Sequence, residues 1–257
     1  MAKERSRSRT STALWAGVRR LLDAGGPGPQ TVVDLGGGTG GLAVRVAELG
    51  HLVVVVDPSP DALAALERRA REAGVSDRIR AVQGDAAELP AVLAPGGPAA
   101  ADLAGVWPAA GADLLLAHGV LEVVDDPAAA LAAAHAVLRP GGRLSLLLTQ
   151  WSGTVLSRAL AGNLAQALRT VTDPEHRGGD HDLLRRRFDR AGATGLAAAA
   201  GFTVTAVEGV RIFADLVPAA CGASEAEQAQ LLALEEAAAR HEEFLGVAGQ
   251  LHLHAHR

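Results

Sequence analysis

The sequence contains no tyrosine and a single cysteine, and aromatic residues make up only 3% of its 257 residues. The lone Cys221 excludes an intrachain disulfide, and it also excludes any metal site built on a pair of thiolates. Its expected role is that of a small buried apolar residue. The shortage of lysine and tyrosine beside abundant alanine, glycine and arginine is typical of a GC-rich genome, so it carries little functional information.

Long hydrophobic runs are also absent. No apolar stretch approaches the roughly 20 residues that a membrane-spanning helix requires. The basic start MAKERSRSRT leads into an amphipathic helical pattern, not into the apolar core of a signal peptide. We therefore expect a cytoplasmic protein with no membrane span. The net charge of −5 gives the whole molecule no attraction to a polyanion, although local basic patches can still provide one.

What the chain does contain is a regular alternation of short apolar runs and helical patterns. The apolar runs are continuous rather than alternating, which is typical of a parallel sheet covered by helices on both faces. The pattern therefore predicts a doubly wound α/β fold. Strands are expected at 31–35, 52–56, 79–83, 113–117 and 144–149, and helices near 40–49, 60–73 and 127–138, with a weaker one before 103.

Further elements are expected on either side of this core. An N-terminal helix is predicted to start at a cap near Ser11 or Thr12 and to stop at Gly25. After the fifth strand, the regular alternation of strands and helices ends. The patterns there predict a helix over 154–168, a strand within 202–216, a long helix over 224–245 and a last strand over 250–256.

The last strand carries alternating histidines in the segment QLHLHAHR. His252, His254 and His256 are predicted to share one face of this strand. We interpret that face as exposed rather than as a metal site, because no acidic residues lie at close spacing to complete a ligand set.

The densest motif is TVVDLGGGTGGLAV, in which five glycines fill six positions after a buried strand. Glycines at such a point let backbone N–H groups approach a ligand where a Cβ would collide. The loop fits two fingerprints and leaves the ligand open between them. Gly36, Gly38 and Gly41 match the dinucleotide pattern GxGxxG. Asp34, with Gly36, Gly38 and Gly40, matches the DxGxGxG loop of S-adenosylmethionine enzymes.

Segments after the next strands favour the second ligand. Asp57 ends the second strand, where an acid accepts hydrogen bonds from ribose hydroxyls in either class. In GDAAELP, Asp85 is placed to accept from an adenine amino group, and Ala86 offers a backbone N–H. Together with AHGVLEVVDDP and VLRPGGRLSLLL, this series resembles class I S-adenosylmethionine-dependent methyltransferases. That resemblance implies a Rossmann-like, mostly parallel seven-stranded sheet with an antiparallel last strand, and it makes a dehydrogenase a minor alternative.

A closer resemblance covers nearly the whole chain. The segments LSRALAGNL, GVRIFADL and LLALEEAAARHEEFLGVAGQLHLHA look like the family of bacterial tRNA 5-carboxymethoxyuridine methyltransferases. The family binds its cofactor through the glycine loop, the acid after the second strand, a backbone pair after the third strand and a histidine after the fourth. It also uses an N-terminal arginine, for which Arg9 is the candidate here. The resemblance therefore implies cofactor contacts by Gly36, Gly37, Asp57, Ala86, Ala87 and His118.

The same resemblance implies carboxyl O-methylation of 5-carboxymethoxyuridine at the tRNA wobble position. A carboxylate is already ionised at neutral pH, so rate comes from positioning and no catalytic side chain or metal is expected. Arg211 is the candidate for holding the substrate carboxylate, because arginine pairs with carboxylates in a bidentate manner. Asn163, the single asparagine, and Trp151, which is suited to stack a base, are further candidates for substrate contacts.

We expect one methyltransferase domain over residues 1–257, with tRNA or a small molecule as its substrate. Two alternative functions stay open: a methyltransferase acting on a small-molecule metabolite, and a non-catalytic cofactor-binding protein. The oligomeric state is also open. The predicted segments of the domain are a basic segment and helix (1–28), a cofactor-binding core (29–150), a helical cap or substrate region (151–200) and C-terminal strands with a helix (201–257).

Overall fold

The computed structural model describes residues 2–105, 107–217 and 224–257, with side chains described from residue 13 onward. Cys221 and the side chain of Arg9 therefore lie outside the described part. None of the described helices combines the length and apolar character needed to cross a bilayer.

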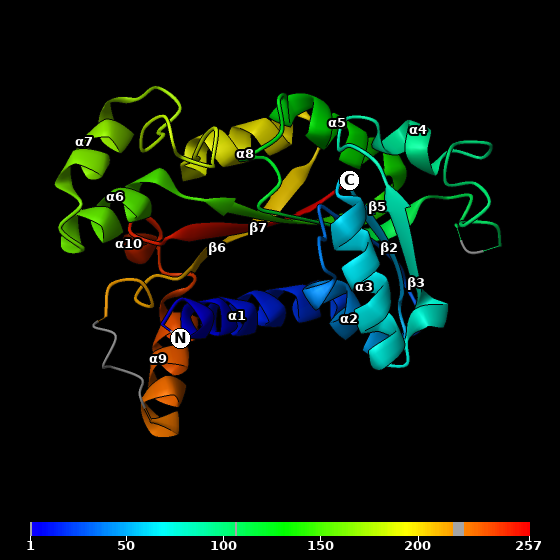
Figure 1. Ribbon diagram of the computed structural model, residues 1–257, viewed down its shortest axis with the longest axis horizontal. Coiled ribbons are helices and arrows are strands. Elements are labelled where there is room, and N and C mark those ends of the chain that lie inside the picture. Colours follow the sequence, from blue (N-terminus) through cyan, green and yellow to red (C-terminus); the bar gives the residue numbers. More distant parts are fainter. Residues whose placement is uncertain (1, 106, 218–223) are drawn as a thin grey trace. The chain divides into compact units, whose positions relative to one another are not determined.

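The strands form a single seven-stranded sheet with the order β3-β2-β1-β4-β5-β7-β6 (Figure 1). This order, with the chain reversing between β1 and β4, is that of a doubly wound sheet. The strands are β1 (Thr31–Leu35), β2 (Leu52–Asp57), β3 (Ile79–Gln83), β4 (Ala112–His118), β5 (Leu138–Thr149), β6 (Thr203–Val210) and β7 (Gln250–His256).

The last strand runs against its neighbours. At one end of β5, Gly141 donates its N–H to Arg257 O at 3.2 Å, and at the other end Gln150 donates to Gly249 O at 3.0 Å. Residue numbers that increase along β5 are therefore paired with residue numbers that decrease along β7, so the two strands are antiparallel. The predicted mostly parallel sheet with an antiparallel last strand is confirmed.

The helices occur in the order that the sequence patterns predicted, but several begin or end at residues other than those expected. They are α1 (Ala2–Ala24), α2 (Gly41–Glu48), α3 (Pro60–Glu72), η1 (Ser76–Arg78), α4 (Leu89–Leu93), α5 (Pro127–Val137), α6 (Trp151–Leu160), α7 (Leu164–Thr172), α8 (Arg190–Ala199), α9 (Glu225–Ala238) and α10 (Glu242–Leu245).

Three of the predicted helix bounds were wrong. The first helix starts at Ala2, so positions 11 and 12 lie inside it and not at its start, and it ends before Gly25 as predicted. The predicted helix over 154–168 is broken between α6 and α7, where Gly162 adopts φ +78°. The predicted helix over 224–245 begins at a Ser224 capping box but ends at Ala238, and the short α10 follows it.

The chain packs as two compact units. We call residues 20–146, 196–205 and 254–257 the core unit, and residues 1–19, 147–195 and 206–253 the appended unit. The prediction of a single domain with four segments stays a prediction.

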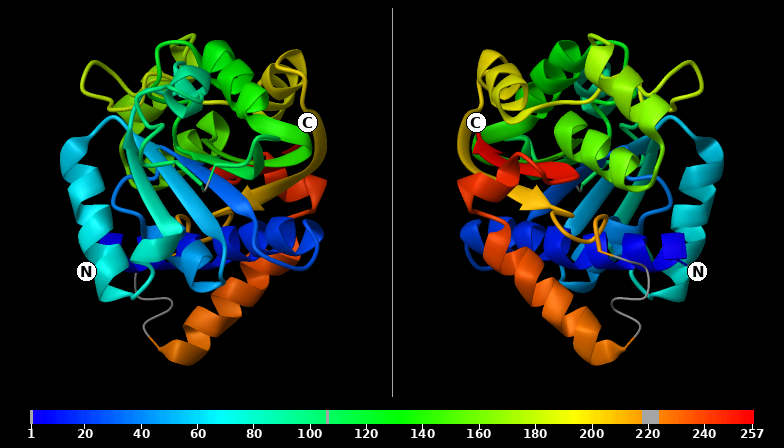
Figure 2. Two further views of the ribbon diagram at one scale, coloured as in Figure 1. Left: turned by 90° about the vertical axis from the view of Figure 1, so that its right-hand side faces the viewer. Right: turned by 90° about the vertical axis from the view of Figure 1, so that its left-hand side faces the viewer.

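The core unit contains the parallel strands β1 to β4. Strand β1 pairs with β2, placing Leu35 opposite Val56, and with β4, placing Leu35 opposite Ala117. All four valines at 53–56 are fully buried, as a sheet covered on both faces requires. Helices α2 and α3 lie on one face of these strands and α5 on the other (Figure 2). Because the strands are parallel, their carboxyl ends meet at one edge of the sheet.

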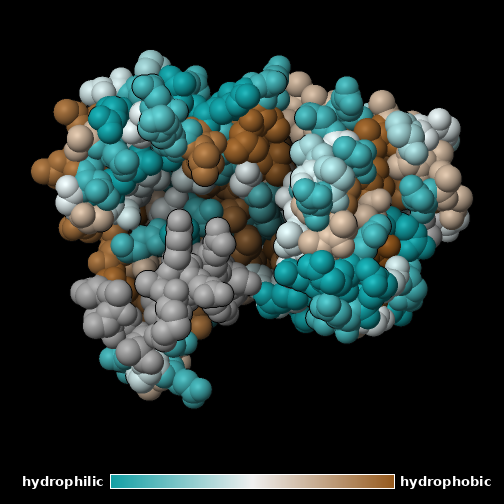
Figure 3. Space-filling view, in the orientation of Figure 1, coloured by the Kyte–Doolittle hydropathy of each residue, from teal (hydrophilic) through white to brown (hydrophobic). Residues whose placement is uncertain are grey.

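In the appended unit, α6 and α7 carry an exposed apolar margin (Figure 3). Leu160 ends α6, and Leu164 and Leu168 lie one helical turn apart on α7, each more than half exposed. The opposite side of α7 buries Ala167 and Thr170. The outer side of α7 therefore carries apolar residues where a surface helix usually carries polar or charged ones.

The interpretation of the terminal histidines as an exposed face was wrong. His252 is fully buried, His254 is 6% exposed, and only His256 is exposed. The reason is that both faces of β7 are covered, since residues 251–255 are all buried. Alternation in sequence cannot distinguish an exposed face from a polar buried one.

Candidate functional site

The glycine loop after β1 requires residues without a Cβ for reasons that the structure makes explicit. Gly36, Gly38 and Gly40 have φ values of +66°, +55° and +74°, in the left-handed region that favours glycine. A Cβ at Gly40 would also overlap Leu66, and one at Gly37 would lie 2.6 Å from Asp34 Oδ2. The loop therefore leads into α2 as bare backbone.

Asp57, the last residue of β2, ties this loop to the neighbouring strand. Its Oδ2 accepts the N–H of Gly38 at 2.9 Å, and its Oδ1 accepts the N–H of Ser59 at 2.9 Å. Each carboxylate oxygen has a second lone pair, so the group retains capacity to accept hydroxyl donors from a ligand. The side chain is 8% exposed, which keeps its orientation fixed.

Asp34 is a buried acid beside the same loop. It is 3% exposed, and within the described part of the chain its Oδ2 has no hydrogen-bond partner. Burial, reinforced by the charge of Asp57, raises the pKa of Asp34 to about 7. A cationic group bound at this loop would compensate the carboxylate and restore its ionised form. The local chemistry therefore fits a ligand that carries positive charge.

The segment after β3 is arranged partly as predicted. Asp85 is exposed, and its Oδ1 accepts the N–H of Ala87 at 3.1 Å, so this N–H already has a partner within the protein. Ala86 is buried. Asp85 keeps lone pairs for a further donor, such as an amino group.

His118 ends β4, and its environment holds it neutral. Its Nε2 lies 2.8 Å from Oγ of Ser145, which is fully buried in β5. Burial, reinforced by the nearby His254, lowers the pKa of His118 to about 3. The ring is therefore a polar contact at neutral pH and not a cation. No sequence motif pointed to Ser145; the only signal was one polar residue within the apolar run RLSLLL.

Comparison with known proteins decides the ligand class. Residues 33–144 match the family model described as a methyltransferase domain. The chain is 30% identical over 244 residues to the tRNA 5-carboxymethoxyuridine methyltransferase of Escherichia coli, an alignment that covers 95% of this chain and 86% of the relative. The chain belongs to the S-adenosylmethionine-dependent methyltransferases. Its cofactor is S-adenosylmethionine, whose sulfonium and amino groups agree with the uncompensated carboxylate of Asp34.

Relatives with a different reaction match less of the chain. A ubiquinone/menaquinone biosynthesis C-methyltransferase from Vibrio vulnificus is 33% identical, but the alignment covers 52% of this chain and 46% of that protein. Among solved structures, a magnesium protoporphyrin IX methyltransferase from Synechocystis with bound SAH aligns at a TM-score of 0.60. Its identity is 14%, over 98% of this chain and 84% of its own. The likeness to this structure shows the shared fold.

In the appended unit of the methyltransferase, Arg211 lines a cavity of about 230 Å³. It is a non-glycine residue with φ +59°, and its Nε donates to Asp215 Oδ1 at 3.1 Å. Its Nη2 donates to the same oxygen. Among the described residues, the remaining guanidinium N–H groups have no protein partner. The other residues lining this cavity are Thr149, Gly153, Thr154, Ser157, Arg158, Asp215, Gly249 and Gln250.

The strained backbone at Arg211 is held by a carboxylate that no sequence motif indicated. Glu235 of α9 is 5% exposed and accepts the backbone N–H groups of three consecutive residues. The distances from the donors to the Glu235 oxygens are 2.9 Å for Ile212, 2.8 Å for Phe213 and 2.7 Å for Ala214. Three charge-assisted hydrogen bonds compensate the cost of the left-handed residue that precedes them.

The two other predicted substrate residues lie elsewhere in the appended unit. Trp151 stacks on His176, with ring centroids 4.6 Å apart and an angle of 16° between the planes. Asn163 is exposed at the start of α7, and its side chain makes no capping hydrogen bond. Neither residue is among those that line the cavity beside Arg211.

Proposed function

We propose that this methyltransferase esterifies the carboxylate of 5-carboxymethoxyuridine at the wobble position of tRNA, in the cytoplasm. The observation that carries the proposal is the extent of the Escherichia coli match, which covers 95% of the chain, whereas the general methyltransferase model ends at residue 144. The similarity therefore includes the appended unit. The Vibrio relative, whose alignment covers only 52% of this chain, is a C-methyltransferase of ubiquinone and menaquinone biosynthesis.

The cofactor contacts that we propose all belong to the core unit, except for Arg9. The bare backbone of Gly36, Gly37, Gly38 and Gly40 lets the ligand lie against the loop. Asp57 is proposed to accept from the ribose hydroxyls and Asp34 to face the positive charge. The adenine contacts are assigned to Asp85, Ala86 and Ala87, a further polar contact to His118, and the family's N-terminal arginine contact to Arg9.

Methyl transfer to a carboxylate requires no acid or base catalysis by the side chains. S-adenosylmethionine supplies the methyl group, and the acceptor carboxylate is already an anion at neutral pH, so no residue needs to remove a proton. The protein's contribution is to orient the acceptor and exclude water. Arg211 is proposed to hold the carboxylate through the guanidinium N–H groups that Asp215 does not use. Asn163 and Trp151 remain proposed contacts with the RNA.

The test is to incubate the purified protein with isotopically labelled cofactor and tRNA from a strain that lacks this enzyme. Nucleosides are then separated and identified by mass spectrometry. The expected result is label in an alkali-labile methyl ester of 5-carboxymethoxyuridine. A parallel reaction with a small-molecule extract is the control. Label confined to that extract would overturn the RNA substrate and leave the methyltransferase activity intact.

A further inference from the structure

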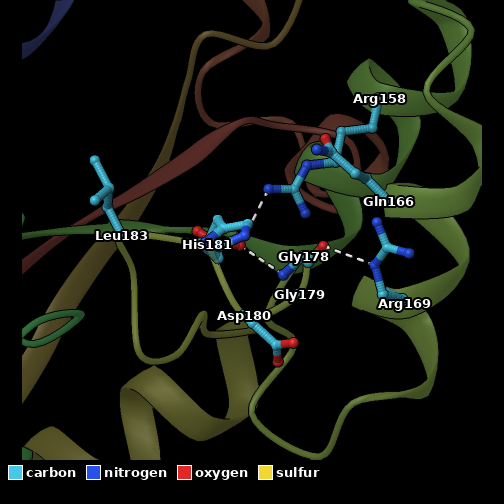
Figure 4. Close-up of a pocket in the computed structure, with 9 residues that line it drawn as sticks. Arg158, Gln166, Arg169, Gly178, Gly179, Asp180, His181 and Leu183 are labelled. Carbon is cyan, nitrogen blue, oxygen red and sulfur yellow. Dashed lines mark hydrogen bonds and ion pairs between the residues drawn. The ribbon is translucent and has the colours of Figure 1, made fainter.

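A second and larger cavity, of about 570 Å³, lies entirely within the appended unit (Figure 4). Side chains from α6 and α7 form part of its wall, and the segment 178–183 forms the rest. Cationic and amide groups dominate the α6 and α7 part, which is provided by Arg158, Gln166 and Arg169.

Arg158 is fixed in this wall by a buried carboxylate. Its Nη2 lies 3.1 Å from Asp182 Oδ2, and its Nη1 donates to Thr170 Oγ1. Asp182 is also paired with Arg187 at 2.8 Å, so two guanidinium groups share one carboxylate. These three side chains together carry one net positive charge. Burial opposes the ionisation of Asp182, but hydrogen bonds, chiefly from Arg187, hold its pKa well below the usual range. The excess charge therefore persists at neutral pH.

Arg169 adds a second, less constrained cation. Its Nε donates to the backbone oxygen of Gly178 at 3.0 Å, and within the described part of the chain no carboxylate pairs with it. In Figure 4 the carboxylate of Asp180 points away from both arginines. The guanidinium groups can approach the loop closely because Gly178 and Gly179 have no Cβ. A Cβ at Gly179 would lie 3.0 Å from Arg169 Nε.

We propose that this cavity binds a backbone phosphate of the RNA substrate, with Arg169 as the main contact and Arg158 as its fixed partner. The inference rests on the proposed tRNA substrate. Guanidinium groups pair with phosphate oxygens through parallel N–H donors, and Gln166 offers a neutral donor beside them. The chain as a whole has a net charge of −5, so it needs a local cationic site to hold a polyanion. A phosphate contact positions RNA without reading its sequence.

The test compares Arg169→Gln with Arg190→Gln. Arg190 is an exposed arginine of the appended unit that pairs with Glu242 at 2.9 Å and does not line the cavity. Binding of an anticodon stem-loop RNA is measured without cofactor at several salt concentrations. Arg169→Gln is expected to weaken binding about tenfold and to lower the slope of log affinity against log salt by about one. Cofactor affinity should stay unchanged in both variants, and thermal unfolding checks that both remain folded at the assay temperature.

Arg169→Lys separates charge from geometry. It should restore most of the salt slope, because the charge returns, but only part of the affinity, because lysine lacks the planar fork. Equal effects of Arg169→Gln and Arg190→Gln on RNA binding, or no effect of Arg169→Gln, would overturn the phosphate site.

Inorganic phosphate is the second probe. It should compete with RNA for the unmodified protein and not for Arg169→Gln. If Arg169→Gln binds and methylates RNA as well as the unmodified protein does, the phosphate site is refuted but the proposed function is not. If the unmodified protein binds phosphate here but no RNA, the cavity is a site for small anions, and both this inference and the proposed substrate fail.

Discussion

The core and appended units build their polar sites in different ways. In the core unit, the acids at the cofactor edge of the sheet are arranged around backbone: Asp57 accepts from Gly38 and Ser59, and Asp34 lies against the loop. In the appended unit, the arginines of the two cavities are paired with carboxylates, Arg211 with Asp215 and Arg158 with Asp182. Backbone positions are fixed by the fold itself, whereas paired side chains can exchange partners. This difference agrees with our proposal that the cofactor, which many enzymes share, contacts backbone, and that a substrate particular to one family contacts adjustable side chains.

The largest expected effect concerns the buried carboxylate of the core unit. Burial, reinforced by the charge of Asp57, raises the pKa of Asp34 to about 7 in the folded protein, from its ordinary value of 3.8. The folded state thus binds the proton more tightly, so this group's contribution to stability is present below pH 4 and is lost as pH rises through 7. Asp34→Asn should remove this dependence. Relative to the unmodified protein, we expect the unfolding free energy of the variant to rise by about 4 kcal/mol between pH 4 and pH 8.

Urea unfolding of both proteins across that pH range, without cofactor, provides the measurement. Bound cofactor should reduce the difference, because its positive charge stabilises the ionised carboxylate. A constant difference between the two proteins at all pH values would show that Asp34 does not titrate in this range.

The next effect tests whether the loop is held by conformation or by packing. Gly40→Ala is expected to lower the unfolding free energy by about 2–4 kcal/mol, since it combines a left-handed backbone with overlap against Leu66. Gly74→Ala is the matched control. Gly74 has φ +71° but nothing within reach of a Cβ, so its cost should be only about 1–2 kcal/mol. Thermal and urea unfolding measure both. Equal costs would mean that the Leu66 contact relaxes freely.

The smallest expected effects come from substitutions that distinguish the function of the core unit from that of the appended unit. Asp57→Asn is expected to weaken cofactor binding by about 1.5–3 kcal/mol and to leave RNA affinity unchanged. Arg211→Gln should raise the KM for RNA about tenfold and leave cofactor affinity unchanged, with Arg190→Gln as the control. Calorimetry with the cofactor and steady-state kinetics with RNA provide the two readouts. If Arg211→Gln impaired cofactor binding instead, Arg211 would have to be removed from the proposed substrate site.

The parts of the fold that depend on local pattern were predictable. The valines at 53–56 and the five glycines after β1 carry their signal within a few residues, and both were placed correctly. Asp215 lies four residues after Arg211, so that pair was also within reach of the sequence. The break between α6 and α7 had a signal in Gly162, but a glycine in a helical pattern does not specify a break.

Other features depend on contacts between distant residues and could not be predicted. Ser145 meets His118 only because β4 and β5 are neighbours in the sheet. Arg158 and Asp182 come together across a loop that follows no simple periodicity. His252 and His254 are buried because both faces of β7 are covered, which alternation in the sequence cannot report. The pKa values follow burial, so they too were inaccessible from the sequence.

The position of β7 between β5 and β6 determines when the sheet can be completed during synthesis of the chain. Strand β6 leaves the ribosome some forty residues before β7, yet it has no place in the sheet until β7 arrives, because the two older strands are never adjacent. Until that moment the nascent protein displays two unsatisfied strand edges, which are the surfaces most prone to pair with other chains. Production at high temperature, or slow translation of the segment between β6 and β7, should therefore favour insoluble material, even though the folded protein has a well-paired sheet.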